Sequence, residues 1–389
     1  MTTSAELVAR AVALQPLVRE HAAKTEADRR VATECIEAIT EAELFAVSVP
    51  KRYGGHETDL RTMLDVSAAI GEADGSTGWV VALTNVCNWL ASLFPERAQD
   101  EVFGSGPARV TGVLTPTATS RKVEGGWEIS GRWYYNSGSW WSTWAVLGTP
   151  LTNEAGEVVD QGLVLVPASE LTVEDVWHVA GMRGTASNCL VGEKLFVPEH
   201  RVMSVPEAVE GTYATEHTEE ALYRSAFIPL LTLVLAGPQL GLGRAALNLV
   251  IDKAGKKPIS YTFFETQAES TAFQLQISEA ATKIDIAHLL VDRATKDVDG
   301  AAARGESLDY TARARVRADA GAAVAHIVDA LTILMNAHGA GGFAEVSPLQ
   351  RIWRDVNVGA RHAVISQTIG AEVYGKALLG IEEKITPLV

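Results

Sequence analysis

The sequence predicts an α+β protein with three parts: an N-terminal helical domain over residues 1–107, a middle β-barrel or β-sandwich domain over 108–219, and a C-terminal four-helix bundle over 220–389. Two observations support this division. The 389 residues are 47% hydrophobic and 21% charged, which are ordinary values for a globular protein. The spacing of apolar residues also changes twice along the chain, from helical to strand-like and back again.

The first part has the apolar spacing of amphipathic helices. Leu7–Ala23 and Val31–Ala46 place apolar residues three and four positions apart, so each range is predicted to be a helix. Pro50, Gly54 and Gly75 mark breaks between the helices.

The middle part is richer in β-branched and aromatic residues. Gly125 and Gly126 lie between Thr119–Val123 and Trp127–Ile129, which predicts a β-hairpin. Asn153–Gly156 predicts a second turn. With further strands expected at Gln161–Val166 and Cys189–Val197, the part is predicted to hold six to eight strands.

The last part returns to long helices, with apolar residues in two stripes. One stripe contains Phe273, Ile277, Ala280, Ile284, Ala287 and Val291, and the other contains Val316, Val324, Ile327, Leu331 and Leu334. Few breaks interrupt them, which favours an up-and-down bundle. The apolar helix surface exceeds what one bundle covers, so we expect an oligomer.

Charge and cysteine content exclude several classes of function. The net charge of −15 disfavours binding to nucleic acid or to an anionic membrane surface. The three cysteines are far apart and the histidines lack metal-ligand spacing, so we expect free buried thiols and no metal. The start of the chain has no signal-peptide core, and the 12-residue apolar run Ala226–Gly237 is too short to span a bilayer, so a cytoplasmic location is expected.

A glycine-rich segment beginning at Gly241 resembles a degenerate dinucleotide fingerprint. That motif requires a preceding strand, whereas an apolar helical segment with Pro238 comes before it here. Small residues for close helix packing are the better interpretation.

Residues 131–144 contain four tryptophans and have two interpretations. They form either the packed core of the β domain or an aromatic pocket with Asn136, Ser137 and Ser139 as its polar groups. Trp79 and Trp89, from the N-terminal helices, are expected to close the other side of such a pocket.

Two further segments carry chemically useful side chains. Residues 181–188, with Arg183 and Ser187, form either a loop that holds a phosphate or polar ring edge, or a plain surface loop. On a helix, Asp355, Gly359 and His362 would share one face, where His362 is either a general acid or base or a structural residue.

Taken in order, several short motifs resemble the acyl-CoA dehydrogenase superfamily over nearly the whole chain. They are Val49–Gly55, Leu114-Thr-Pro116, Trp133-Tyr-Tyr-Asn136, Gly181–Ser187 before a strand ending in Phe196-Val-Pro198, and Gly341–Gly342 followed by Pro348, Arg351, Arg354 and Asp355. The resemblance implies the superfamily's fold of helices, β domain and four-helix bundle.

The sequence departs from the dehydrogenases at their catalytic base and at one flavin contact. Residues 358–362 hold no glutamate where the dehydrogenases carry their base, and residues 233–248 hold no acid at the alternative position. Ser260 replaces an arginine that grips the FAD pyrophosphate, three residues before Phe263.

These departures are similar to the group D flavin-dependent monooxygenases, the oxygenase components of two-component hydroxylases. The segment Arg183–Asn188, the pair Ser137–Gly138 and His362 after the C-terminal Arg-Asp carry this resemblance. It implies reduced FMN or FAD supplied by a separate NAD(P)H-dependent flavin reductase, O2 as co-substrate, a C4a-hydroperoxyflavin, and hydroxylation of a small aromatic compound such as an indole, a phenol or a polycyclic aromatic. A homotetramer is also implied.

The resemblance assigns roles to individual residues. His362, Ser137 and Asn136 are expected to be catalytic, with Trp133 and Trp144 helping to exclude water. The substrate pocket is expected to be lined by Trp79, Trp89, Trp140 and Trp141. Flavin contacts are expected from Leu114, Thr115, Tyr135, Asn136, Ser137, Arg183, Ser187 and Phe263.

Three alternatives stay open at this point. The first is a flavin dehydrogenase with a non-standard base, and the second is an N- or S-oxygenase on the same fold. The third is a helical scaffold without enzymatic activity.

Overall fold

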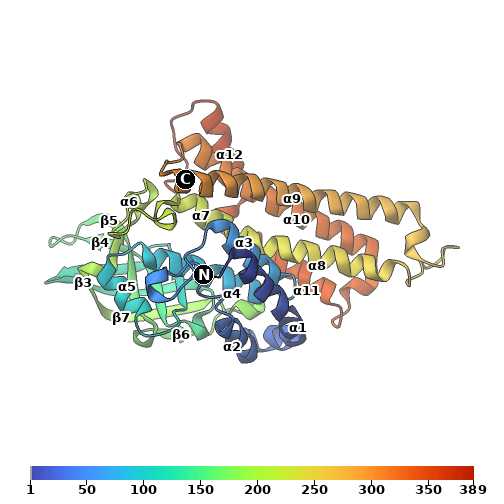
Figure 1. The fold of residues 1–389 in the computed structure, drawn as a ribbon, viewed down its shortest axis with the longest axis horizontal. Helices are drawn as coiled ribbons and strands as arrows, with labels where there is room; N and C mark the ends of the chain where they lie inside the picture. The colour runs from blue at the N-terminus through green and yellow to red at the C-terminus, as the bar shows by residue number, and fades with distance from the viewer. Residues whose placement is uncertain (1) are drawn as a thin grey trace.

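The computed structural model describes residues 2–389 and places the N-terminal helices between a β domain and a long helical bundle (Figure 1). The N-terminal helices are α1 (Ser4–Asp28), α2 (Thr33–Glu41), α3 (Leu60–Gly71), α4 (Gly75–Ser92) and α5 (Glu96–Phe103). The predicted helix over 31–46 is shorter than expected, because Glu43 adopts a left-handed conformation with φ of 62° and ends α2 early.

Helix α4 is the central element of this layer. Asp74 caps its start by accepting a hydrogen bond from the amide of Thr77 at 2.8 Å. All but one of its 18 residues are buried, so it has no solvent-facing side. A helix surrounded in this way presents different side chains to several parts of the protein at once.

The β domain consists of two four-stranded sheets. One has the order β1-β4-β5-β8 and the other β2-β3-β7-β6. The predicted hairpin is confirmed, since β2 and β3 pair antiparallel around Gly125 and Gly126. The bounds are β1 (Val110–Val113), β2 (Ala118–Val123), β3 (Gly126–Asn136), β4 (Trp144–Thr152), β5 (Val158–Pro167), β6 (Thr172–Glu174), β7 (Asn188–Pro198) and β8 (Val202–Ser204).

Short helices and then long ones complete the chain. They are α6 (Val205–Val209), α7 (Phe227–Leu233), α8 (Ala236–Ala254), α9 (Thr271–Arg304), α10 (Tyr310–His338), α11 (Pro348–Gly359) and α12 (Gln367–Leu378). Helices α9 and α10 lie side by side, and α10 also contacts α8, α11 and α12 (Figure 1). Both predicted apolar stripes face inward, and only Ile277 of the eleven residues is less than fully buried.

Two helical stretches, 227–254 and 310–338, are long and apolar enough to cross a membrane by length and composition alone. The 12-residue run considered in the sequence therefore understated how far the apolar character extends. In the folded chain 78% and 56% of their most apolar windows are buried, which is expected of helices that form a protein core.

The glycine-rich segment of α8 serves close helix packing, as the sequence analysis inferred. A Cβ atom added to Gly241 would lie 2.2 Å from the carbonyl oxygen of Ala68 in α3. Gly71 of α3 approaches Pro238 of α8 in the same way. The two helix backbones therefore touch directly, and this contact joins the N-terminal layer to the bundle.

Replacing Gly241 with alanine should destabilise the protein by about 1–3 kcal/mol, because the new methyl group would meet backbone atoms that cannot rotate away. Thermal unfolding measures the effect. Gly375→Ala in α12 is the matched control, since nothing lies within 4 Å of its added Cβ, and it should leave the protein unchanged or slightly more stable. Equal midpoints for the two variants would contradict the proposed packing.

Candidate functional site

Trp79 connects two of the predicted catalytic residues. Its indole Nε1 donates a hydrogen bond to the Ser137 hydroxyl at 3.2 Å, and its ring lies 6.1 Å from the ring of His362, centroid to centroid. Trp79 belongs to α4, Ser137 follows β3, and His362 follows α11. Three regions that are distant in sequence thus meet at one tryptophan.

Ser137 lies at one end of a chain of hydroxyl groups. Its Oγ is 2.8 Å from that of Ser187, which is 2.7 Å from Oγ1 of Thr185. Thr185 donates its proton to the carbonyl oxygen of Met182 at 2.9 Å. Each hydroxyl has one proton, so Ser187 donates to Thr185 and Ser137 donates to Ser187. Ser137 also accepts from Trp79, which leaves one lone pair on its oxygen free to accept another hydrogen bond.

The pairing of β3 with β7 explains why these hydroxyl groups meet. Asn136 at the end of β3 lies opposite Asn188 at the start of β7. Residues just after β3 therefore lie beside residues just before β7. The Gly138 amide donates to the Thr185 carbonyl at 2.7 Å, and the Ser139 hydroxyl donates to the Ala186 carbonyl at 2.7 Å.

A buried carboxyl group holds the turn that precedes β7. Asp355 in α11 accepts a hydrogen bond from the Met182 amide at 2.5 Å. Met182 and Ala186 both have positive φ, 53° and 47°, so the turn is an unfavourable backbone conformation for these residues. Gly181 permits the close approach, because a Cβ there would lie 2.4 Å from the Arg354 carbonyl oxygen.

The environment of Asp355 favours its protonated form. Burial and the nearby carboxylate of Asp74 raise the pKa of Asp355 to about 7, although the Met182 amide and the charge of Arg351 act in the opposite direction. Burial also raises the pKa of Asp74. The two carboxyl groups therefore titrate together.

His362 lies beyond α11, not on it. The expectation that Asp355, Gly359 and His362 share one helical face is wrong, because α11 ends at Gly359. His362 is an exposed residue whose ring nevertheless lies among protein atoms: it packs beside Trp79, and its Nδ1 accepts a hydrogen bond from the Val364 amide at 3.4 Å. The region between Trp79, Ser137 and His362, called the cleft below, therefore reaches solvent at His362. The protein atoms around the ring lower the pKa of His362 to about 4, so the imidazole is neutral near pH 7.

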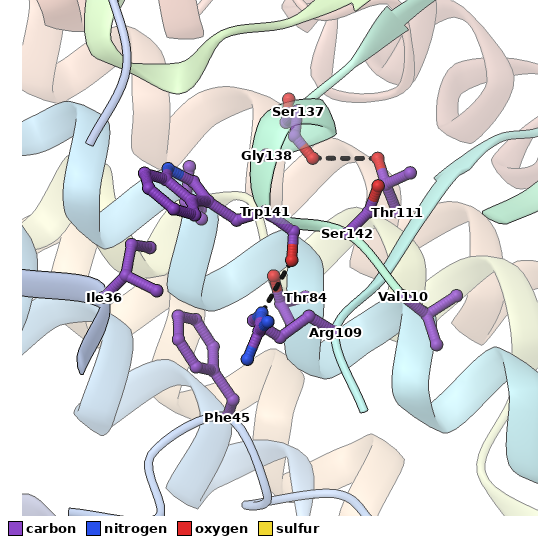
Figure 2. Close-up of a pocket in the computed structure, with 11 residues that line it drawn as sticks. Ile36, Phe45, Thr84, Arg109, Val110, Thr111, Ser137, Gly138, Trp141 and Ser142 are labelled. Atoms are coloured by element: carbon purple, nitrogen blue, oxygen red, sulfur yellow. Dashed lines mark hydrogen bonds between the residues drawn. The ribbon is translucent and has the colours of Figure 1, made fainter. Parts of the chain in front are cut away.

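A small pocket lies beside this cluster, where Ser137, Gly138 and Trp141 lie on one side and Thr84 of α4 on another (Figure 2). Val80 of α4 also lines it. The remaining lining residues are Ile36, Phe45, Arg109, Val110, Thr111 and Ser142. The space between its walls has no room for a water molecule, which is an accessible volume of about 0 Å³. Ligand sites usually measure at least about 300 Å³, so a ligand must displace part of the wall.

The tryptophans that the sequence grouped together separate in the structure. Trp141 lines the pocket, and Trp140 is 42% exposed beside it. Trp89 lies elsewhere: its Nε1 donates to the Leu222 carbonyl at 2.9 Å, and its ring packs on Tyr213 and Phe227. Ten residues separate it from Trp79, about 15 Å along α4. The structure therefore does not bring Trp89 to the pocket.

Trp133 and Trp144 likewise do not form the water-excluding wall expected from the sequence. Trp133 is fully buried in the β-domain core and donates to the Gly148 carbonyl at 2.8 Å. The guanidinium of Arg201 lies 5.0 Å over the ring of Trp144. Here the core interpretation of the tryptophan-rich segment holds, because Trp133 packs between the two sheets and Trp144 packs into the main core on the same face as its register partner Val110. Neither side chain is among those that line the pocket.

The residues expected to contact flavin are also divided. Ser137, Ser187 and Asn136 are buried together, and the Oδ1 atom of Asn136 has no hydrogen-bond partner among residues 2–389. Tyr135 is exposed, with φ of 72°, and packs edge-on against Trp177.

The other expected contacts lie further from this buried group. Leu114 and Thr115 lie just beyond β1, where Thr115 is exposed. Arg183 donates to the Glu26 carbonyl in α1 at 3.3 Å and makes no hydrogen bond to Ser137 or His362. Phe263 is fully exposed on the α8–α9 connection, at the end of the bundle remote from the β domain (Figure 1).

Seven pocket residues had no sequence signal as site residues: Ile36, Phe45, Val80, Thr84, Arg109, Val110 and Thr111. Thr111 donates to the Ser137 carbonyl at 2.8 Å and so fixes the backbone beside the central hydroxyl. Arg109 is a single arginine between Ala108 and Val110 at the start of a strand. An isolated charge inside an apolar segment is the only feature that marks it.

Comparison of the sequence and the fold with known proteins identifies the family of this chain. The acyl-CoA dehydrogenase N-terminal domain matches residues 6–104, and the C-terminal domain matches residues 233–367. The flavin-dependent monooxygenase oxygenase subunit HsaA of Rhodococcus jostii is 31% identical, and the match covers 95% of this chain and 97% of that protein. The chain belongs to the flavin-dependent monooxygenases that have the acyl-CoA dehydrogenase fold.

Two further comparisons support the assignment of this oxygenase. The oxygenase component of an FADH2-dependent resorcinol hydroxylase from Rhizobium sp. is 30% identical over 97% of the chain and 95% of that protein. The structure of XiaF from Streptomyces sp. in complex with FADH2 and glycerol has a TM-score of 0.95 and 39% identity, covering 99% and 98% of the two chains.

The residues present fit a flavin. An isoalloxazine ring needs apolar walls and hydrogen-bond partners along one edge. Trp79 and the open side of His362 provide walls, while the free lone pair of Ser137 and the unpaired Oδ1 of Asn136 provide acceptors. Within residues 2–389 there is no cluster of three or more potential metal ligands.

The variant Asp355→Asn should become more stable relative to the wild type as pH rises from 5 to 8. The folded wild type has a pKa of about 7 at Asp355, above the ordinary value, so it loses stability as pH rises toward and through 7, by up to about 1.4 kcal/mol per pH unit. Asparagine keeps the acceptor for Met182 but has no charge to bury.

The measurement is the difference in unfolding midpoint between the variant and the wild type at each pH. Asp252→Asn, on an exposed part of α8, controls for loss of a negative charge alone. A difference that does not change with pH for Asp355→Asn would contradict this account of the carboxyl pair.

Proposed function

We propose that this oxygenase uses reduced flavin from a separate NAD(P)H-dependent reductase and O2 to hydroxylate a flat aromatic compound. The observation that carries the proposal is the junction at Trp79, which brings the Ser137 hydroxyl and the neutral His362 imidazole to one cleft beside a mostly apolar pocket. The acceptor groups and aromatic walls in this cleft suit a flavin edge, and the pocket suits an apolar ring.

When bound, the reduced flavin supplies the two electrons needed to activate O2. Ser137, Asn136 and Ser187 would hold its polar edge, with Trp79 and His362 against the ring. The complex of XiaF with FADH2 and the FADH2-dependent resorcinol hydroxylase favour FAD over FMN for this chain.

Ser137 is suited to hold a proton donated by the flavin edge. Its own proton goes to Ser187, and Trp79 donates to one of its lone pairs, so the remaining lone pair accepts. Because Thr111 fixes the Ser137 carbonyl and Asp355 fixes the turn carrying Ser187, this acceptor keeps its orientation. Such preorganisation is what a site needs to retain a labile proton.

His362 is suited to take a proton from a substrate hydroxyl group or to relay one. Its Nδ1 accepts a long hydrogen bond from the Val364 amide at 3.4 Å, so the proton of the neutral ring lies on Nε2, and Nδ1 takes up a proton once it leaves that amide. The lowered pKa keeps the ring neutral at working pH. Trp141, Val80 and Ile36 make the adjacent pocket apolar and keep water from the reacting atoms.

A dehydrogenase reaction lacks a base in this site. The two carboxyl groups nearest the turn, Asp74 and Asp355, both accept hydrogen bonds from backbone amides and are fully buried. Neither is free to remove a proton from a substrate. This observation favours oxygenation over the dehydrogenase alternative.

We also propose a homotetramer in the cytoplasm. Tyr261 and Phe263 are fully exposed on the α8–α9 connection, and apolar residues there need covering. Light scattering after size-exclusion chromatography should give four times the chain mass. In such an assembly Phe263 would serve a neighbouring copy, since the α8–α9 connection that carries it lies at the end of the bundle remote from the β domain (Figure 1).

An isotope experiment tests the proposed reaction. Protein with chemically reduced FAD is mixed with indole and ¹⁸O2, and the product is analysed by mass spectrometry. One ¹⁸O atom per hydroxylated product is expected. If one molecule of hydrogen peroxide forms for each reduced flavin that is oxidised, no oxygen has reached the substrate and the proposal fails. Anaerobic bleaching of oxidised FAD by acyl-CoA thioesters would then indicate a dehydrogenase.

His362→Ala should lower the yield of product per reduced flavin oxidised by about 10- to 100-fold, because no other side chain replaces its proton transfer. His178→Ala removes an exposed histidine outside the cleft and should leave the yield unchanged. A wild-type yield in His362→Ala would show that the imidazole has no part in proton transfer.

A further inference from the structure

The carbonyl oxygen of Met182 fixes one end of the hydroxyl chain that reaches Ser137. A carbonyl oxygen only accepts hydrogen bonds, so the Thr185 hydroxyl, 2.9 Å away, directs its proton there. If that proton pointed elsewhere, lone pairs of the two oxygens would face each other at this distance. Thr185 is 1% exposed, so bulk solvent does not reach its hydroxyl group.

The direction of each later hydrogen bond follows from this first one. With its own proton engaged, Thr185 accepts from Ser187 at 2.7 Å, and Ser187 accepts from Ser137 at 2.8 Å. The Trp79 indole donates to Ser137 at 3.2 Å. Ser137 therefore offers a lone pair, and no proton, to a group that approaches it from the cleft.

The residue before Ser137 adds a second acceptor. Asn136 is fully buried, and its Nδ2 donates to the Trp133 carbonyl at 2.6 Å, which identifies the other atom of the amide as the oxygen. That Oδ1 atom has no hydrogen-bond partner among residues 2–389. A ligand edge that carries an N–H group suits these acceptors, whereas an edge of bare nitrogen and oxygen atoms leaves them unpaired.

The edge of a flavin differs in this respect between its two redox states. Reduced flavin carries a proton on N5, whereas the N5 atom of oxidised flavin has no proton and only accepts hydrogen bonds. An acceptor at Ser137 therefore suits the reduced form. A donor at the same place would suit the oxidised form.

We propose that Thr185 is a positioning residue: it holds the hydroxyl chain in the direction that keeps Ser137 an acceptor, and so makes the site favour reduced over oxidised flavin. The inference rests on the proposed function for the identity of the ligand, and it adds the residue that sets the hydrogen-bonding state of the site. Thr185 acts through Ser187 and Ser137, and it takes no part in oxygen transfer.

Removal of the Thr185 hydroxyl should reverse the chain. In Thr185→Val, Ser187 has no oxygen at position 185 to donate to, so its proton turns to Ser137, and Ser137 turns its own proton toward the cleft. The Met182 carbonyl still accepts from the Trp177 indole at 2.8 Å and from the amide of residue 185 at 3.2 Å. Valine therefore leaves no unpaired carbonyl group behind, and it has nearly the shape of threonine.

The experiment measures the dissociation constants of reduced and oxidised FAD for each protein by anaerobic titration calorimetry. Wild type should bind reduced FAD at least about 10-fold more tightly than oxidised FAD, and Thr185→Val should lower this ratio by about 10-fold, the effect of one hydrogen bond lost in a buried site. Because the ratio compares two ligands on the same protein, a general loosening of the fold does not change it.

Matched variants isolate the hydroxyl group. Thr185→Ser keeps it and should keep the ratio within about twofold. Thr295→Val removes the hydroxyl of an equally buried threonine in α9, which donates to the Val291 carbonyl at 2.7 Å, and should also keep the ratio. If Thr185→Val does not fold, Ser187→Ala breaks the chain at its next link, frees the Ser137 proton and should lower the ratio in the same way.

A wild-type ratio of one or less, an unchanged ratio in Thr185→Val or a lowered ratio in Thr185→Ser overturns the proposal. The ¹⁸O2 experiment distinguishes this failure from failure of the proposed function. Incorporation of ¹⁸O together with an unchanged ratio in Thr185→Val removes the role of Thr185 and keeps the oxygenase reaction. A lowered ratio in that variant without incorporation of ¹⁸O supports the role of Thr185 and removes the reaction, and a wild type that binds neither form of FAD overturns both.

Discussion

The hydrogen bond from the Met182 amide to the buried Asp355 carboxyl group is the interaction on which the site depends. It fastens α11 of the C-terminal part to the turn before β7, and that turn carries Thr185 and Ser187. Because Ser187 donates its proton to Thr185, Ser137 donates its own proton to Ser187. The turn has two non-glycine residues with positive φ, so it keeps this conformation only because tertiary contacts hold it. A buried acid thereby sets the hydrogen-bonding state of a side chain on another domain.

The site also shows how three separate parts of the chain produce one cleft. Helix α4 comes from the first part, the ends of β3 and β7 from the second, and the segment after α11 from the third. The close backbone contact between α3 and α8 fixes the first part against the third, because glycines at Gly71 and Gly241 let main-chain atoms touch directly and no flexible side chain lies between them. The cleft is therefore defined by rigid elements, and it reaches solvent at His362.

Local patterns predicted most of the fold, and long-range placement explains what they missed. The hairpin at Gly125 and the apolar stripes of α9 and α10 depend on nearest neighbours along the chain, which the sequence shows directly. The tryptophan-rich segment signalled an important region but not the direction of each ring: Trp133 packs between the sheets, Trp144 packs into the main core, and Trp141 lines the pocket. Trp89 was misplaced because composition does not reveal distance along a helix.

The complete burial of α4 has a consequence for how such enzymes diversify. Trp79 faces the His362 cleft, whereas its neighbour Val80, about 100° further around the helix, and Thr84 one turn on face the pocket. Substitutions at positions 80 and 84 reshape the space offered to a substrate while the residues around Trp79 stay as they are. Selection can therefore change the compounds that a lineage accepts through a few substitutions on one helix, and the oxygen chemistry is inherited intact.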